Sequence, residues 1–373
     1  MRRGLARTVL AAALPLLLTA LGTTTPERAL AAPAWAEALG AQVQKLERET
    51  PGQFGLYVKR LDNGETFTWQ ADRRWYLASS AKLPLAIAVL QEVQQGRLRL
   101  DQELRVEERD KIDGSGALVW QPVGTQHSVE TLLRRMLMES DNTAANLLIR
   151  TIGQETFNTR AQALMGARNV GPLTNFTQVR QDVYAELHPR AREIAPMDLV
   201  RVAAAPMGPQ RVQALARTLQ VGKDELQVKT MEEAYDRYYA RGANTATLAG
   251  YGGMLEKLVR GQLLTPPHQQ MLYKDLKFDT YDAYRLEAGL PRTVRFIHKT
   301  GTQYHRACHM GVIDPQDGGA RAIVVATCAE GMDEMRQAGR LFEQIGRAIT
   351  RTLLQDRPAA QPAEAQTRST SAP

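Results

Sequence analysis

Strand patterns lie near both ends of this chain of 373 residues, and the long interval between them has helical spacing. Near the start, two alternating segments flank an Asp-Asn-Gly sequence at 62–64, a strong signal for a β-hairpin turn. Near the end, strand patterns return at 293–302 and in a second hairpin over 308–328. Apolar residues recur at helical spacing from about 83 to 285. One sheet built from strands of both ends satisfies this order.

The predicted fold class is α/β, of the α+β type. We expect an antiparallel sheet built from both termini, flanked by helices, with an adjoining helical lobe at about 83–285. Helices are expected at 35–48 and at 335–355, where the second one closes the fold. The expected domain runs from 32 to 356, and its length allows either two lobes or one large layered fold.

The first 31 residues are expected to be a signal peptide. They combine a basic start, a short apolar run and a small-residue site that ends at Ala31, which is the pattern of a secretory leader. The apolar run is too short to span a bilayer and no second one follows, so we expect no membrane span in the mature chain. These features predict an exported protein, periplasmic or extracellular, with a disordered tail at 357–373.

The formal net charge of +7 includes +3 from the leader. The other arginines are scattered among acidic residues, as on a solvated surface, and we see no basic stripe with interleaved aromatic residues. Nucleic acid is therefore not expected as a partner. We expect a monomer that acts on a small-molecule substrate.

The only two cysteines, Cys308 and Cys328, belong to a chain that is expected to reach an oxidising compartment. They flank a predicted hairpin, and pairing Ile313 with Ile323 would bring both cysteines to one face. A cross-strand disulfide and two buried thiols both remain open.

A metal site at His305, Cys308 and His309 is an alternative reading of the sequence His-Arg-Ala-Cys-His. On a strand the two histidines would share a face about 13 Å apart, and Cys308 would face away. This separation is too large for one zinc ion, so no metal or other cofactor is expected.

Ser79 and Lys82 stand three residues apart, where a polar segment turns into an apolar helical run. On a helix such residues share a face about 5–6 Å apart. A lysine placed there can take the serine proton if burial or nearby positive charge lowers its pKa. Helix capping by the serine and a surface position for the lysine are the alternative.

Two further polar clusters follow along the chain. Ser140, Asp141 and Asn142 lie between two helical runs, where they are either caps or groups directed into a cleft. Lys299 lies near the end of an apolar strand and precedes Thr300, Gly301 and Thr302. A glycine at that place allows a ligand to approach the strand backbone closely.

Together the three clusters read S-x-x-K, S-D-N and K-T-G, a set typical of class A β-lactamases and penicillin-binding proteins. The chain resembles this family of penicillin-recognising serine hydrolases. The resemblance extends to the segments at 140–153 and 244–264 and to the closing part from Phe296 to about Thr352. It leaves out roughly residues 155 to 240, and the interval between the second and third motifs is longer than is usual in the family.

The resemblance implies a role for each motif residue. Ser79 matches the acylated nucleophile, and Lys82 matches its neighbouring base. Ser140 matches the hydroxyl that passes a proton to the leaving nitrogen. Asn142 matches the amide that holds both the lysine and the substrate side chain.

The third motif is implied to bind the other end of the substrate. Lys299 and Thr300 match the groups that hold its carboxylate. The backbone N–H groups of Ser79 and Thr302, beside Gly301, would form the oxyanion hole, since the tetrahedral intermediate needs two donors in place.

Two features of the family pattern are missing. The E-x-x-L-N sequence, whose glutamate activates the deacylating water, does not occur. Glu232 and Glu233 are candidates for this base in one alignment register and Glu186 in another; it is equally open that no base exists. The arginine usual on the strand after K-T-G is also absent, and Arg306 is the nearest substitute.

These observations favour an exported serine β-lactamase that hydrolyses the β-lactam amide through a Ser79 acyl-enzyme. A D-alanyl-D-alanine carboxypeptidase, or penicillin-binding protein, acting on peptidoglycan peptides is the alternative. A sensor of β-lactams or muropeptides that is acylated without turnover is a third. The expected partner is accordingly a β-lactam or a D-Ala-D-Ala peptide.

Overall fold

The computed structural model describes residues 32–277 and 283–355. The expected signal peptide and the expected disordered tail therefore lie outside the described residues. Within the described ranges, no helix has the length and apolar character that are needed to cross a bilayer.

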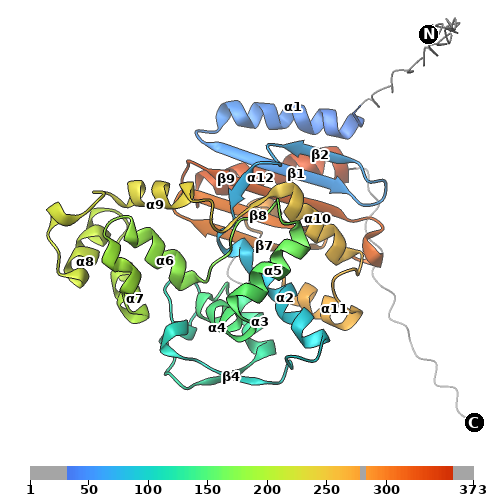
Figure 1. Cartoon of the computed structure of the whole chain (residues 1–373). Helices are drawn as coiled ribbons and strands as arrows, with labels where there is room; N and C mark the ends of the chain where they lie inside the picture. The colour runs from blue at the N-terminus through green and yellow to red at the C-terminus, as the bar shows by residue number, and fades with distance from the viewer. Residues whose placement is uncertain (1–31, 278–282, 356–373) are drawn as a thin grey trace, which may run out of the picture. The chain divides into compact units, whose positions relative to one another are not determined.

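A five-stranded sheet forms the centre of the fold, in the order β2-β1-β9-β8-β7 (Figure 1). All neighbouring strands are antiparallel, and the N-terminal strand β1 pairs along its full length with the C-terminal strand β9. The predicted sheet built from both termini is thus confirmed. The strands are β1 (Gln53–Arg60), β2 (Thr66–Trp69), β7 (Phe296–Gln303), β8 (Arg306–Ile313) and β9 (Ile323–Glu330).

One face of the sheet is covered by α1 (Ala34–Glu49) and α12 (Gln337–Ile349) (Figure 1). Alternate residues of β1 point to this side, because successive side chains of a strand face opposite ways. Leu56 and Val58 accordingly join the apolar cluster of the two helices, whereas Tyr57 joins the cluster on the opposite face. The first and last helices predicted from the sequence therefore share one layer.

The opposite face carries the larger apolar cluster, into which α2 and α10 are packed. Lys82 is the first residue of α2, and its side chain is buried with most of this helix despite its charge-bearing amine. The helices around this cluster are α2 (Lys82–Gln94), α3 (Val129–Met138), α4 (Asn142–Ile152), α5 (Gln154–Met165), α10 (Leu248–Val259) and α11 (Pro266–Asp275). Two short strand pairs complete this part: β3 (Arg74–Tyr76) with β6 (Thr245–Thr247), and β4 (Glu103–Arg105) with β5 (Gln126–Ser128).

Four helices form an extension with an apolar cluster of its own, at the left of Figure 1. They are α6 (Phe176–Ala185), α7 (Pro196–Ala204), α8 (Pro209–Leu219) and α9 (Met231–Ala240). Tyr76 and Ala78, which precede Ser79, belong to the same cluster. The residues that lengthen the interval between the second and third motifs are therefore packed against the chain that leads to the candidate nucleophile.

The β8–β9 hairpin settles the state of the cysteines. Ile313 pairs with Ile323 and Cys308 with Cys328, and the two sulfur atoms form a disulfide. His305 lies in the turn before β8. The strand position that was assumed for His305 when a metal site was excluded is therefore wrong. Among the described residues, no group of three His, Cys, Asp or Glu side chains is arranged to hold a metal ion.

Candidate active site

Ser79 lies in a tight turn, Ala78–Ala81, between β3 and α2. Ala78 has a φ of 46°, in the left-handed region that costs an alanine about 1–2 kcal/mol. The α-helix begins only at Lys82, so Pro84 falls in its first turn, where a missing N–H breaks no helical hydrogen bond. The turn thus presents Ser79 at the end of a buried helix, and strain of this kind is common at functional sites.

The Lys82 ammonium group is surrounded by oxygen atoms. Its Nζ lies 3.1 Å from Ser79 Oγ, 3.1 Å from Ser140 Oγ and 2.6 Å from Asn142 Oδ1, and it also donates to the Ser140 carbonyl. The side chain is fully buried. Burial, followed by the charge of Lys299, lowers the pKa of Lys82 well below its usual value. A neutral amine at this place can accept the Ser79 proton.

Ser140 connects the two lysines. Its Oγ lies 3.1 Å from Lys82 Nζ and 3.1 Å from Lys299 Nζ. Its φ of 56° is again left-handed and turns the chain between α3 and α4. The next residue, Asp141, caps α4 by accepting from Ala144 N–H at 2.9 Å. The cap reading of this motif therefore applies to Asp141, whereas Ser140 faces the lysines.

Lys299 is buried on β7, and burial together with the positive charge of Arg285 lowers its pKa to about 7. Thr300 beside it is buried as well, whereas Thr302 is exposed at the end of the strand. A Cβ on Gly301 would lie 2.2 Å from the carbonyl oxygen of Leu77. The glycine thus lets β7 pass close to the Ser79 turn. The group that approaches Gly301 is therefore protein backbone, whereas the sequence had suggested a ligand.

A small cavity opens beside Ser79. It is bordered by the Ser79 turn, by the loop that contains Asp113, by the first residue of α4, by the end of β7 and by α6 of the helical extension. The lining residues are Tyr76, Ala78, Ser79, Ile112, Asp113, Asn142, Phe176, Val179, Arg180, Thr302 and Gln303. Ser79 and Asn142 thus line a cavity, and Lys82, Ser140 and Lys299 are connected to them by the contacts above, although the five residues come from three separate parts of the chain.

Comparison with known proteins agrees with this geometry. The model of the β-lactamase enzyme family matches residues 38–353. The chain belongs to this family. The resemblance inferred from the three motifs is thereby confirmed.

The family relatives are distant in sequence. β-Lactamase L2 of Stenotrophomonas maltophilia is 25% identical over 346 residues, which cover 91% of this chain and 93% of that protein. β-Lactamase SME-1 of Serratia marcescens is 32% identical over 113 residues, only 30% of this chain and 38% of its own length. The solved structure of PBP-A superposes with a TM-score of 0.61 at 19% identity, covers 84% of this chain and 95% of its own, and shows the shared fold.

An aromatic ring contacts the amine of Lys82. The Phe176 ring lies over Lys82 Nζ, 4.6 Å from the ring centroid to the nitrogen. Phe176 is the first residue of α6, and its N–H donates to Asn146 Oδ1 at 2.8 Å. A cation–π contact accounts for the position of the ring when the lysine is charged.

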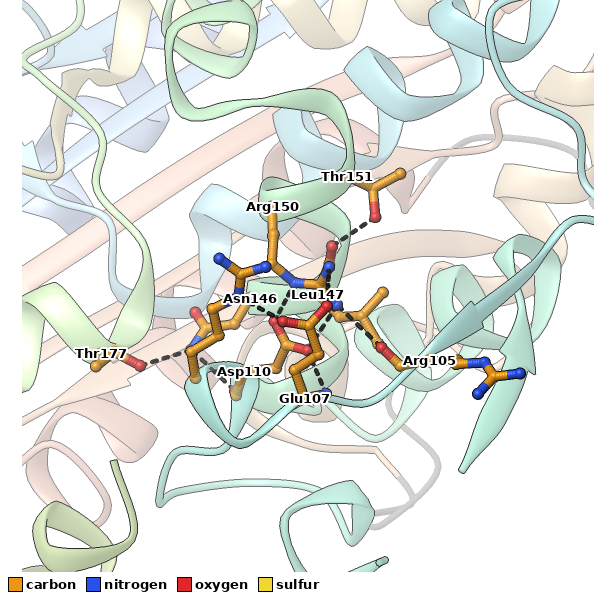
Figure 2. A network of polar contacts seen from close by, with 9 residues as sticks. Arg105, Glu107, Asp110, Asn146, Leu147, Arg150, Thr151 and Thr177 are labelled. Atoms are coloured by element: carbon orange, nitrogen blue, oxygen red, sulfur yellow. Dashed lines mark hydrogen bonds and ion pairs between the residues drawn. The ribbon is translucent and has the colours of Figure 1, made fainter. Parts of the chain in front are cut away.

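Asn146 is itself held by a polar network (Figure 2). Its Nδ2 donates to Thr177 Oγ1 at 2.9 Å and to the Asp110 carbonyl at 3.1 Å. In the same network, Arg150 binds the Asp110 carboxylate through Nε at 2.7 Å and Nη2 at 2.8 Å. The start of α6, and with it Phe176, is therefore anchored to α4, the helix that also carries Asn142 at its first residue.

The three glutamates considered from the sequence as deacylation bases do not line the cavity. Glu186 forms an ion pair with Arg241, and Glu233 lies 3.0 Å from Arg237. Glu232 is exposed on the first turn of α9. Among the described lining residues the only carboxylate is Asp113, which is bound by Arg180.

Arg285 is a site residue that the sequence analysis missed. Its buried guanidinium donates from Nη1 to the Gly301 carbonyl at 3.0 Å and from Nη2 to Thr302 Oγ1 at 2.9 Å. The proposed substitute, Arg306, instead lies over the Tyr239 ring and 3.5 Å from Glu330. No local motif marks Arg285, because its contact with the K-T-G strand exists only in the folded chain.

The depressed pKa of Lys299 predicts how acylation depends on pH. Lys299 loses its proton as the pH rises through about 7, so an anionic substrate loses its ion pair. We expect the second-order acylation rate constant for a penicillin to fall about tenfold per pH unit well above 7. Intact-mass rates for a penicillin and for its carboxylate methyl ester, between about pH 5 and pH 9, test this expectation. An equal alkaline fall for the uncharged ester would contradict it.

Proposed function

We propose that this chain is an exported serine hydrolase that is acylated at Ser79 by β-lactams and by peptides that end in D-alanyl-D-alanine. We further propose that it releases the penicilloyl group slowly, in the manner of a penicillin-binding peptidase. Of the functions inferred from the sequence, the penicillin-binding peptidase is thus preferred to the β-lactamase. The single observation that carries this preference is the Phe176 ring on Lys82 Nζ.

Acylation follows from the polar contacts of the site. Neutral Lys82 takes the proton of Ser79 Oγ while this oxygen attacks the amide carbonyl carbon. The proton then passes through Ser140 Oγ, which lies 3.1 Å from Lys82 Nζ, to the departing nitrogen. The C–N bond breaks and an ester to Ser79 remains. The backbone N–H groups of Ser79 and Thr302 are proposed to stabilise the oxyanion.

Substrate orientation is assigned to the K-T-G strand. Lys299 and Thr300 are proposed to hold the carboxylate, and Arg285 keeps Thr302 in place behind them. Asn142 bridges Lys82 and the Asp113 carbonyl, to which its Nδ2 donates at 2.8 Å. This amide is proposed to border the acyl side of the substrate.

Hydrolysis of the ester needs a water molecule and a base on the open side of Ser79. Phe176 covers that side of Lys82 with carbon atoms, which can neither accept a proton nor hold a water by hydrogen bonds. An amine of a second substrate can attack the ester carbonyl by the reverse of acylation. Its proton passes through Ser140 Oγ and Lys82 to the departing Ser79 oxygen, so no further base is required. Slow hydrolysis and release to an amine therefore fit the site together.

Rapid hydrolysis of β-lactams is the second candidate. It is favoured by the curated relatives, which are β-lactamases, and by the match to the family model over residues 38–353. In that case a base other than Glu186, Glu232 and Glu233 must reach the ester, because none of these three lines the cavity.

An intact-mass time course of the mature protein with benzylpenicillin tests the proposal. We expect a single adduct of one penicillin mass that persists for many minutes. Its lifetime should shorten when a D-amino acid is added as acceptor. An adduct that clears within seconds while hydrolysed penicillin accumulates would favour the β-lactamase. Complete absence of an adduct would overturn acylation at this site.

A further inference from the structure

Asp113 and Arg180 form an ion pair inside the cavity that opens beside Ser79. Arg180 Nε lies 3.0 Å from Asp113 Oδ1, and Arg180 Nη2 lies 2.5 Å from Oδ2. The pair is bidentate, and the two side chains are only 11% and 13% exposed. Because both partners are largely withdrawn from water, removal of one of them would leave the other charge buried without its partner.

The two charges are held from different elements. Arg180 extends from α6, and its Nη1 also donates to Tyr235 Oη on α9 at 2.8 Å. Asp113 lies in the loop between the short 3-10 helices Glu108–Asp110 and Leu118–Trp120, and its carbonyl accepts from Asn142 Nδ2. Both groups are therefore positioned by their own supports, and the pair bridges the helical extension and the loop that borders Asn142.

The acyl side of a substrate points toward this pair. If Lys299 and Thr300 hold the substrate carboxylate, the reacting carbonyl lies at Ser79 and the acyl side chain continues past Asn142. Asn142, Asp113 and Arg180 line the same cavity as Ser79. The side chain of the substrate must consequently meet both charges or leave that part of the cavity unused.

We propose that Asp113 and Arg180 form a subsite that selects substrates whose acyl side chain carries both an ammonium and a carboxylate group. The proposal rests on the acylation of Ser79 proposed above. The ammonium group would bind Asp113 and the carboxylate would bind Arg180. Each protein charge would thus give up its present partner and gain a substrate group of the same sign as that partner. A neutral substrate side chain that separates Asp113 from Arg180 leaves both charges desolvated and without an ionic partner. A side chain with a single charge leaves one of the two protein charges without an ionic partner.

Penicillins that share one nucleus and differ in side chain test the subsite. The series comprises phenylacetyl (neutral), adipyl (one carboxylate), α-aminophenylacetyl (one ammonium) and α-aminoadipyl (both groups). The second-order acylation rate constant of each is measured by competition with a fluorescent penicillin. We expect the α-aminoadipyl compound to acylate the wild-type protein at least about tenfold faster than the other three.

Variants then attribute the preference to the pair. The double variant Asp113→Asn/Arg180→Gln should reduce the preference to about twofold or less, whereas Arg192→Gln should retain it. Arg192 is a matched control because it pairs with Asp182 on the surface of the same extension and does not line the cavity.

The outcomes separate this inference from the proposed function. Equal rates for the four penicillins on the wild-type protein would overturn the subsite while acylation stands, and this result needs no variant to fold. An adipyl compound as fast as the α-aminoadipyl one would also overturn it, since Arg180 alone would then suffice. No adduct with any compound would overturn the proposed acylation itself.

Discussion

Replacing Ser79 by alanine is expected to abolish covalent labelling by penicillins. The hydroxyl oxygen is the atom that becomes acylated in the proposed reaction, and Lys82 Nζ lies 3.1 Å from it. Without this oxygen the remaining groups can bind a β-lactam but cannot form the ester. The labelling rate should fall by at least about a thousandfold, to the detection limit of intact-mass measurement.

Ser80→Ala is the matched control for this experiment. Ser80 is the next residue of the same turn, and its buried Oγ has no hydrogen-bond partner among the described residues. Its removal should therefore leave labelling within about threefold of wild type and the melting temperature nearly unchanged. Adducts that persist in Ser79→Ala but disappear in Ser80→Ala would show that the nucleophile has been assigned wrongly.

Replacing Phe176 by glutamate is expected to accelerate release of the penicilloyl group by about a hundredfold, the range of a positioned general base. The backbone N–H of residue 176 is held by Asn146, so the new side chain starts from an anchored position. Its carboxylate would face Lys82 Nζ, whose positive charge offsets the cost of burial. A water molecule between the carboxylate and the ester could then be deprotonated.

The same substitution should slow acylation, because a carboxylate beside Lys82 raises the pKa of that lysine and reduces its neutral fraction. Acylation and release must therefore be measured separately, by the appearance and the decay of the adduct. Phe176→Gln supplies similar size and polarity without a base and should not accelerate release. If Gln and Glu gave the same decay rate, loss of the aromatic ring and not base catalysis would explain the change.

The family and the sheet could be predicted from the sequence because both depend on local signals. The Asn-Gly turn at 63–64 and the strand patterns at 293–302 and 308–328 mark strands at the two ends of the chain, and the structure joins them in one sheet through the pairing of β1 with β9. The three motifs are short, and each falls within or beside a single helix or strand, so its residues are neighbours in any fold that forms that element. Their chemistry could be inferred before their positions were known.

The candidate bases show where sequence reasoning ended. Glu186 and Glu233 were considered because of their distance along the chain from the known motifs, but each pairs with an arginine of the helical extension. Arg306 was likewise considered because it is the cation nearest to K-T-G along the chain, but the fold brings Arg285, which was not considered, to Thr302. Spacing along the chain carries no information on such contacts once a long insertion intervenes.

The sequence by itself determined the fold class, the family and the set of polar residues available for acyl transfer, because these follow from periodicity and short motifs. Only the tertiary structure decided that Phe176 covers Lys82, that Asp113 and Arg180 meet in the cavity, and that Cys308 is bonded to Cys328. The first two contacts join elements that are distant along the chain, whereas the disulfide joins neighbouring strands of one hairpin, whose register the sequence left open. Their geometry follows from how the sheet and the helical extension bury their apolar faces, which no local pattern records.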